Sequence, residues 1–149
     1  MFIVFDLDGT LADGSHREHL ILTPGRKQWD RYFDRCDMDA PIWPIVKTLQ
    51  ALHASRRHHI EIWSGRDNSV NWKTRQWLNL HGILRCVKEV KLKPAGLKIE
   101  DHTLKEQWLF EYMTMYDKVP DLVFEDRARV VGMWRSHGVK CCQVAKGDF

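Results

Sequence analysis

Short apolar runs alternate with longer amphipathic segments along most of this chain. The first run, Met1 to Phe5, has the length and uniform apolarity of a buried strand, and Gly9 follows it as a turn residue. Later runs of similar character are also expected to be strands: His59 to Trp63, Cys86 to Leu92, Asp121 to Phe124 and Val139 to Val144. The pattern therefore predicts a sheet assembled from strands spread over the whole chain.

The segments between these runs repeat their apolar residues at helical spacing. Pro41 to about Arg57 is one such segment, with Asp39 as a candidate N-cap. Val70 to His81 is another, and Gly82 has the position of a C-cap. Two more helices are expected: one presents Leu104, Trp108, Tyr112 and Met115 on one face, and one runs from Arg129 to His137 and ends at Gly138.

The alternation of strands and helices predicts an α/β fold. Helices that connect successive strands form right-handed crossovers, so the strands are expected to be parallel with helices on both faces. Binding sites in such sheets lie beyond the carboxyl ends of the strands. Residues 13–40 interrupt the alternation with a polar, irregular stretch. We interpret them as a small insertion within a single domain that spans residues 1–149.

Composition narrows the class of protein. With 149 residues and 44% hydrophobic content, the chain is large enough for one compact core. It has no apolar run of membrane-spanning length and no secretory leader, so no membrane association is expected. A net charge of +3 suits an anionic substrate but is lower than that of most dedicated nucleic-acid binders.

The cysteines lack the spacing of a metal site. Cys36, Cys86, Cys141 and Cys142 include no C-x-x-C pair. We expect them to be small buried hydrophobic residues with reduced thiols, which is typical of a cytoplasmic protein.

Polar side chains follow several of the predicted strands. Asp6 and Asp8 come after the first strand, the sequence SGRD (residues 64–67) after the second, and Glu125 with Asp126 after the fourth. Paired carboxylates at a buried strand end repel each other unless a cation lies between them. Since Mg²⁺ prefers oxygen ligands and commonly binds beside phosphate, these acids predict a magnesium site.

These segments resemble the four motifs of the haloacid dehalogenase (HAD) superfamily of phosphatases. DLDGTLAD, WSGRD, Lys105 and the segment that begins FEDRARVV occur in the superfamily's order, each near its expected strand end. DHTLKEQW and the C-terminal segment are most similar to the 3′-phosphatase domain of phage-type polynucleotide kinase-phosphatases. The resemblance implies a Rossmann-like three-layer sandwich with only a small cap insertion. The sequence has no G-x-x-x-x-G-K-[ST] loop, so the kinase half of such enzymes is not expected.

The resemblance also implies catalytic roles. Asp6 corresponds to the nucleophile that attacks phosphorus and forms an aspartyl-phosphate. Asp8 corresponds to the group that protonates the leaving alcohol and then deprotonates the attacking water. Lys105 would neutralise charge on the transferred phosphoryl group. On residue type alone, Lys105 fits a solvated helix charge equally well, and Asp101 fits either a residue that orients Lys105 or a helix cap near Thr103.

A second group of residues is expected to bind the substrate phosphate. Thr10 and Ser64 offer hydroxyl groups, and the backbone amides around Gly9 and Gly65 offer further donors. Arg17 lies at the offset from Asp6 at which similar phosphatase domains have a functional arginine. Arg66 adjoins Ser64. Surface salt bridges are the alternative for both arginines.

The acids at the strand ends are the expected metal ligands. The resemblance implies Asp6 as a ligand, Asp8 through its backbone carbonyl, Asp126 directly and Glu125 through water. The alternative is that Glu125 or Asp126 caps the following helix or pairs with a nearby arginine.

The short insertion predicts an open site that accepts bulky substrates. Its aromatic residues Trp29, Tyr32 and Phe33 either stack on a base or fold the insertion against the core. The resemblance implies removal of a 3′-terminal phosphate from nucleic-acid ends or nucleotides, in nucleic-acid end repair with a separate kinase or ligase. The alternatives are a phosphatase of a small metabolite and an inactive binding module.

Overall fold

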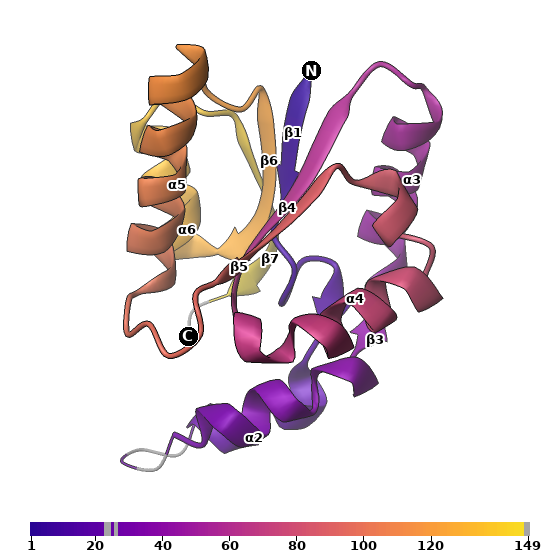
Figure 1. Cartoon of the computed structure of the whole chain (residues 1–149), viewed down its shortest axis with the longest axis vertical. Coiled ribbons are helices and arrows are strands. Elements are labelled where there is room, and N and C mark those ends of the chain that lie inside the picture. The colour runs from indigo at the N-terminus through magenta and orange to yellow at the C-terminus, as the bar shows by residue number, and fades with distance from the viewer. Residues whose placement is uncertain (23–24, 26, 148–149) are drawn as a thin grey trace.

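A computed structural model describes residues 1–22, 25 and 27–147. Its centre is a sheet in the order β5-β4-β1-β6-β7, in which each neighbouring pair is parallel (Figure 1). The strands are β1 (Phe2–Phe5), β4 (His59–Asp67), β5 (Glu89–Lys93), β6 (Leu122–Arg127) and β7 (Cys141–Gly147). The predicted parallel α/β fold is confirmed.

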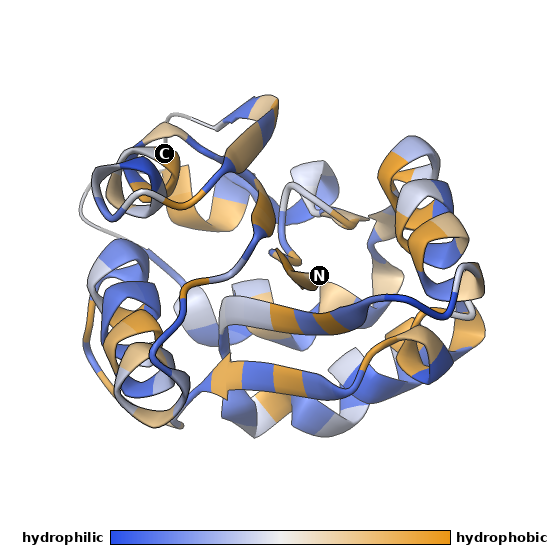
Figure 2. Cartoon of the chain, turned by 90° about the horizontal axis from the view of Figure 1, so that it is seen from above, coloured by the Kyte–Doolittle hydropathy of each residue, from blue (hydrophilic) through white to orange (hydrophobic). Residues whose placement is uncertain are grey.

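Helices cover both faces of the sheet and make it the middle of three layers. On one face lie α3 (Trp43–Ala54) and α4 (Asn71–Leu80), and on the other α5 (Asp101–Tyr116) and α6 (Ala128–Ser136) (Figure 1). Figure 2 shows the same layers from above, with each helix carrying both apolar and polar residues. Short 3₁₀ turns, η3 (Asn68–Val70) and η4 (Leu84–Cys86), flank α4.

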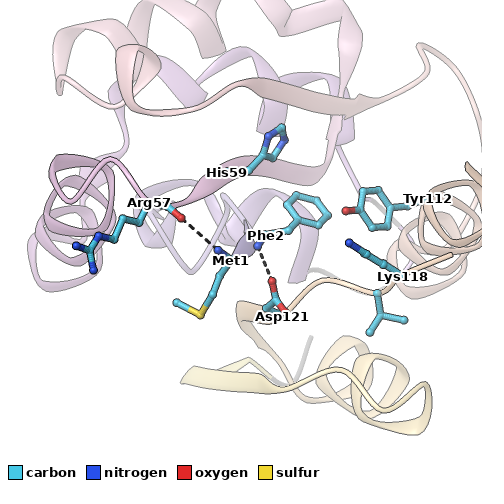
Figure 3. Close-up of a pocket in the computed structure, with 8 residues that line it drawn as sticks. Met1, Phe2, Arg57, His59, Tyr112, Lys118 and Asp121 are labelled. Carbon is cyan, nitrogen blue, oxygen red and sulfur yellow. Dashed lines mark hydrogen bonds between the residues drawn. The ribbon is translucent and has the colours of Figure 1, made fainter. Parts of the chain in front are cut away.

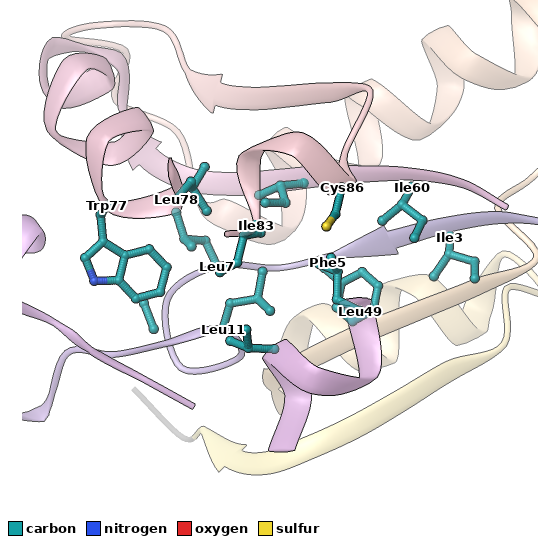
Figure 4. Close-up of a cluster of buried hydrophobic side chains, with 13 residues drawn as sticks. Ile3, Phe5, Leu7, Leu11, Leu49, Ile60, Trp77, Leu78, Ile83 and Cys86 are labelled. Atoms are coloured by element: carbon teal, nitrogen blue, oxygen red, sulfur yellow. The ribbon is translucent and has the colours of Figure 1, made fainter. Parts of the chain in front are cut away.

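The central strand β1 is buried on both faces, as the middle strand of a parallel sheet must be. Ile3 and Phe5 point into a cluster with Leu49 of α3 and Leu78 of α4 (Figure 4). Its other residues, Phe2 and Val4, pack with side chains of α5 and α6 such as Trp108 and Trp134. Because β1 is held by packing on both faces and ends at Phe5, Asp6 has a fixed position just beyond its carboxyl end.

The insertion starts and ends at a small antiparallel pair of strands. β2 (Ala12–Asp13) pairs with β3 (Ala40–Pro41), and Asp13 lies opposite Ala40. Between them the chain forms η1 (Ser15–Arg17), α1 (His19–Leu22), α2 (Trp29–Asp34) and η2 (Cys36–Met38). The described part of the insertion is therefore mainly helical, and the prediction of an irregular stretch was wrong. Figure 1 shows α2 beyond the carboxyl ends of the strands.

The aromatic residues of the insertion hold it together. Tyr32 and Phe33 are buried with Leu20 and Ile21, and Val70 packs against this cluster from outside the insertion. This arrangement agrees with the prediction that aromatic residues fold the insertion against the core. Trp29 stacks on Phe33, with 5.8 Å between ring centroids, and remains 43% exposed.

Several predicted element boundaries were wrong. α3 begins at Trp43 with Ile42 as its N-cap, so Asp39 does not cap it. β5 begins at Glu89, after the turn at 84–86, and β7 begins at Cys141 instead of Val139. Met115, which was expected on the packed face of α5, is 71% exposed. β4 and β6 run on through the polar residues that were expected to follow them, so those residues gain the fixed geometry of a sheet.

Two further findings concern composition. All four cysteines are reduced; Cys36 and Cys86 are buried as expected, whereas Cys141 is only partly buried and Cys142 is exposed on β7. In the described part of the chain, no helix combines the length and apolarity needed to cross a membrane.

Candidate active site

The polar residues at the strand ends meet at one edge of the sheet. Phe5 lies in register with Ile62 of β4 and Phe124 of β6, so the residues that follow these three are brought side by side. The Asp6 N–H donates to the Phe124 carbonyl at 2.9 Å, which continues the β1–β6 pairing to the first acid. The predicted convergence of the strand ends is therefore present.

Three carboxylates form the centre of this edge. Asp6, Glu125 and Asp126 are all buried, and each has an oxygen within 4.8 Å of the others. Lys105, at the start of the second turn of α5, lies 2.6 Å from Asp6 Oδ1 and 2.8 Å from Glu125 Oε2. Its side chain is 1% exposed, so Lys105 is a buried cation of the site and not a solvated helix charge.

Asp101 orients this lysine. Its Oδ2 lies 3.2 Å from Lys105 Nζ, one helical turn away on α5. The alternative that Asp101 caps a helix near Thr103 was wrong, because α5 begins at Asp101 itself and has Glu100 as its N-cap. Gly65 leaves room for the Asp101 side chain, since a Cβ at position 65 would lie 2.5 Å from Asp101 Oδ1. The glycine after Ser64 therefore lets β4 approach the start of α5.

The donor set fits a hard divalent cation. Asp126 Oδ1 is buried and has no hydrogen-bond partner among the described residues. Glu125 is already engaged, since Oε1 accepts the N–H groups of Asp126 and Arg127 and Oε2 accepts from Lys105. A Cβ on Gly9, whose φ is +83°, would clash with the Asp126 carboxylate. An enclosed carboxylate oxygen without a donor, beside two more acids, is the environment that an oxygen-ligated cation would satisfy.

The electrostatics of the acids support the same interpretation. Burial raises the pKa of Asp126 to about 7, with Asp6 adding to the effect. Burial also raises the pKa of Glu125 to about 7, even though Lys105 opposes it. Burial and the neighbouring Glu125 hold the pKa of Asp6 well above its usual range. Without a further positive charge, three such carboxylates do not all ionise at neutral pH.

Asp8 lies among basic groups, unlike the three carboxylates of the cluster. Arg17 Nη2 lies 2.6 Å from its Oδ1, and Arg66 Nη2 lies 2.5 Å from the same atom. Burial alone would raise the pKa of Asp8, but Arg66 and Arg17 outweigh it and hold that pKa well below its usual range. Asp8 keeps 24% of its side chain exposed, so it is the carboxylate of the site that faces solvent.

Asp39 is the site residue that the sequence did not reveal. Its carboxylate is fully buried and accepts from Arg17 Nε at 2.7 Å, from Arg17 Nη2 at 2.5 Å and from Arg66 Nη2 at 3.1 Å. His16 lies 3.0 Å from its Oδ1. The arginine partners are 22 and 27 residues away in the sequence, so no local pattern identifies the contact. Asp8, Arg17, Asp39 and Arg66 thus form one charge-balanced network.

This network predicts a stability effect. Asp39→Asn keeps the shape of the side chain but leaves two buried arginines with Asp8 as their remaining carboxylate in the network. We expect the free energy of unfolding to fall by about 3 kcal/mol, as when one partner of a buried ion pair is removed. Urea denaturation measures this, with the exposed neighbour Asp37→Asn as the matched control. A loss below about 1 kcal/mol would show that the network does not need Asp39.

The structure places the predicted substrate-binding residues as follows. Arg17 and Arg66 are buried and paired with acids, so the alternative of surface salt bridges was wrong. Ser64 Oγ accepts the Arg66 N–H at 3.1 Å, and Thr10 Oγ1 is buried without a partner among the described residues. The Gly9 N–H itself donates to the Ala12 carbonyl at 2.8 Å. Phosphate binding by Thr10, Arg17, Ser64, Gly65 and Arg66 stays a prediction.

Two hollows mark the ends of the sheet. One, of about 340 Å³, lies beside the acids between the starts of α5 and α6. The other, of about 650 Å³, lies at the amino end of β1, where Phe2 donates to Asp121 and Tyr112 and Lys118 project from the far side (Figure 3). None of the acids at the carboxyl end of the sheet lines the second hollow. The first hollow is therefore the one that adjoins the candidate site.

Comparison with known proteins identifies the family. Residues 1–149 match the family model described as the polynucleotide kinase PNKP phosphatase domain. The chain belongs to this family. It is accordingly a phosphatase-type domain of the HAD superfamily, as the motifs at the strand ends predicted.

Solved structures agree with this assignment. The chain is 25% identical to a protein in a Pnkp1/Rnl/Hen1 RNA repair complex, with a TM-score of 0.77 over 99% of this chain and 43% of that one. It therefore spans less than half of that protein's length. The HAD-hydrolase YfnB from Bacillus subtilis, solved bound to magnesium, is 12% identical with a TM-score of 0.64, over 95% of this chain and 86% of that one. A haloacid dehalogenase-like hydrolase from Streptococcus pneumoniae shares 15% identity and a TM-score of 0.63, over 94% and 82%. The last two likenesses show the fold.

Proposed function

We propose that this chain is a Mg²⁺-dependent phosphohydrolase that removes the 3′-terminal phosphate from nucleic-acid ends or nucleotides through an aspartyl-phosphate on Asp6. The observation that carries the proposal is the opposite environment of its two neighbouring aspartates. Asp6 lies among buried acids beside Lys105, whereas Asp8 lies between two arginines and faces solvent. A cation held by the acid cluster would keep Asp6 ionised as the nucleophile, whereas Asp8 lies outside the cluster and is the carboxylate placed to exchange a proton with the leaving group and with water.

The proposed reaction has two steps. In the first, a carboxylate oxygen of Asp6 bonds to phosphorus, the bond from phosphorus to the leaving oxygen breaks, and Asp8 gives its proton to the departing alcohol. In the second, water attacks phosphorus, Asp8 takes the proton back, and the bond to Asp6 breaks to release inorganic phosphate. Lys105, at 2.6 Å from Asp6, would neutralise charge on the phosphoryl group.

Asp8 must hold a proton for the first step, and its arginine partners oppose this. Arg17 and Arg66 both have a second carboxylate partner in Asp39. In the proposed mechanism, a substrate phosphate draws the two guanidinium groups away from Asp8 while Asp39 continues to hold them. Bidentate bonds from arginine suit a phosphate as well as a carboxylate.

The proposed metal ligands are the acids of the cluster. Asp6 and Asp126 would bind Mg²⁺ directly, Asp8 through its backbone carbonyl and Glu125 through water. The unpartnered Oδ1 of Asp126 and the fully engaged oxygens of Glu125 favour this division. A bound divalent cation would keep the carboxylates ionised and screen the phosphate from them.

The proposed substrate class follows from the family. The family model is that of the phosphatase domain of a polynucleotide kinase, and one similar structure belongs to an RNA repair complex. We propose that this chain likewise acts in nucleic-acid end repair, with the kinase or ligase step supplied by a partner. A small-metabolite phosphatase remains the second candidate, because the fold alone is shared with HAD hydrolases of other kinds.

A substrate panel tests the proposal. We expect kcat/KM for a 3′-phosphorylated oligonucleotide to exceed that for the same oligonucleotide with a 5′-phosphate, and that for a nucleoside monophosphate, by about tenfold or more. Inorganic phosphate release over DNA, RNA, mononucleotide and sugar-phosphate substrates measures this. A sugar phosphate or mononucleotide with an equal or higher kcat/KM would favour the metabolite phosphatase. Absence of turnover on the whole panel, with Mg²⁺ present, would favour the inactive binding module.

A further inference from the structure

The hollow beside the acids is a cleft between the starts of two helices. Its lining residues are Glu100, Asp101, His102, Arg127, Ala128, Arg129, Val130 and Gly147. Two of them connect it to the reacting groups, since Arg127 directly follows Asp126 and Asp101 contacts Lys105. A molecule that placed a phosphate at Asp6 and continued beyond it would therefore find this cleft as adjacent space. We call it the α5–α6 cleft.

One wall of the α5–α6 cleft comes from a segment of the chain whose charged residues are all basic. Residues 127–147 contain no Asp or Glu and carry five basic residues: Arg127, Arg129, Arg135, Lys140 and Lys146. Arg127 and Arg129 of this segment line the cleft, whereas Arg135 lies in the last turn of α6. These two guanidinium groups are the local positive charge that a polyanion would meet in the cleft.

Arg129 is the basic residue of the cleft that can most easily exchange its carboxylate partner for a phosphate. Its side chain is 70% exposed, and its Nη1 lies 3.6 Å from Oε2 of Glu100, whose side chain is 72% exposed. An ion pair this open contributes little stability, so an incoming phosphate can replace Glu100 as the partner. Arg127 differs, since it lies 3.5 Å from the more buried Asp101. Glu100 and Asp101 are the acids of the cleft, and both oppose binding of an anion.

We propose that the α5–α6 cleft binds the phosphodiester backbone of the nucleotides that precede the terminal phosphate, with Arg129 as a backbone contact and Glu100 as its competitor. This inference rests on the proposed function and specifies its substrate as a chain. A mononucleotide occupies the acids without reaching the cleft, whereas an oligonucleotide gains one or more charge contacts there. Backbone contacts of this kind are independent of base sequence and sensitive to salt.

Direct binding of an oligonucleotide tests the cleft without requiring hydrolysis. The probe is a fluorescently labelled single-stranded oligonucleotide with a 3′-hydroxyl, followed by fluorescence anisotropy. We expect Arg129→Ala to raise its Kd about threefold to tenfold and to reduce the slope of log K against log salt by about 0.7. Glu100→Gln should lower the Kd by about twofold to threefold, because it removes the competing carboxylate of a weak exposed pair.

Arg135→Ala is the matched control. It removes the same charge from the same helix, but Arg135 lies in the last turn of α6, at the other end from the cleft. We expect its Kd and salt slope to stay within about twofold of wild type. An equal rise in Kd for Arg129→Ala and Arg135→Ala would overturn the proposal that the cleft binds the backbone, since net charge would then explain binding. No effect of Arg129→Ala would overturn it as well. Failure of the wild type to hydrolyse the substrate panel is a separate result, which would overturn the proposed function instead.

Discussion

Asp6→Asn is expected to reduce phosphatase turnover by at least about a thousandfold, equivalent to roughly 4 kcal/mol of lost transition-state stabilisation. An amide has nearly the same shape as a carboxylate but is a poor nucleophile towards phosphorus. The loss should appear in kcat, because the substituted side chain still occupies the position 2.6 Å from Lys105. Release of inorganic phosphate from the best substrate of the panel measures it.

The fold is expected to survive this substitution. Burial and Glu125 both raise the pKa of Asp6, so removing its charge relieves repulsion within the cluster. A melting temperature within a few degrees of wild type separates a chemical effect from unfolding. Asp30→Asn, at an exposed position of α2, is the control variant, in which turnover and melting temperature should match wild type. Turnover by Asp6→Asn within about tenfold of wild type would show that another group attacks phosphorus.

Sequence pattern was a good guide to the fold because the sheet is buried on both faces. A parallel strand covered on both sides is apolar at every position, and β1 shows this in the sequence as well as in the structure. The strand ends were harder to locate. β4 and β6 continue through SGRD and through Glu125 and Asp126, because pairing with neighbouring strands holds polar residues that have no strand propensity of their own.

The same logic explains which parts of the site could be predicted. Acids that follow apolar strands must come together, since parallel strands end at one edge, and Asp6, Glu125 and Asp126 do. The role of Lys105 could be predicted only from the resemblance to a family, because a lysine near the start of a helix is ordinary on residue type alone. Its burial against two carboxylates is a tertiary fact.

The role of Asp39 could not be predicted from the sequence. An aspartate before a helix is usually a cap, and that interpretation was wrong because the helix begins farther on, at Trp43. What fixes Asp39 instead is the pairing of β3 with β2, which closes the insertion and brings Asp39 against Arg17. Burying a carboxylate there is tolerable only with two guanidinium partners. Such mutual dependence among distant residues leaves no local pattern.

The second large effect concerns the metal. Excess chelator is expected to abolish turnover, and added Mg²⁺ to restore it, because the buried acids around Asp6 repel an anionic phosphate unless a cation is present. Ca²⁺ should restore turnover poorly, since its larger and looser coordination shell holds ligands less rigidly. Asp126→Asn, which alters the carboxylate whose Oδ1 has no partner, should raise the Mg²⁺ concentration needed for half-maximal activity by about tenfold or more.

Protons should compete with this metal in a defined pH range. Burial raises the pKa of Asp126 and of Glu125 to about 7 in the metal-free protein, so below that pH both carboxylates hold protons that Mg²⁺ must displace. The apparent affinity for Mg²⁺ should therefore fall as the pH falls from about 8 to about 6, by up to tenfold per pH unit for each proton displaced. Thermal unfolding with and without Mg²⁺ measures this without any substrate, since a ligand that binds the folded state stabilises it. The Mg²⁺-induced rise in melting temperature should be larger at the higher pH, and full turnover in excess chelator or an equal rise at both pH values would contradict the proposed site.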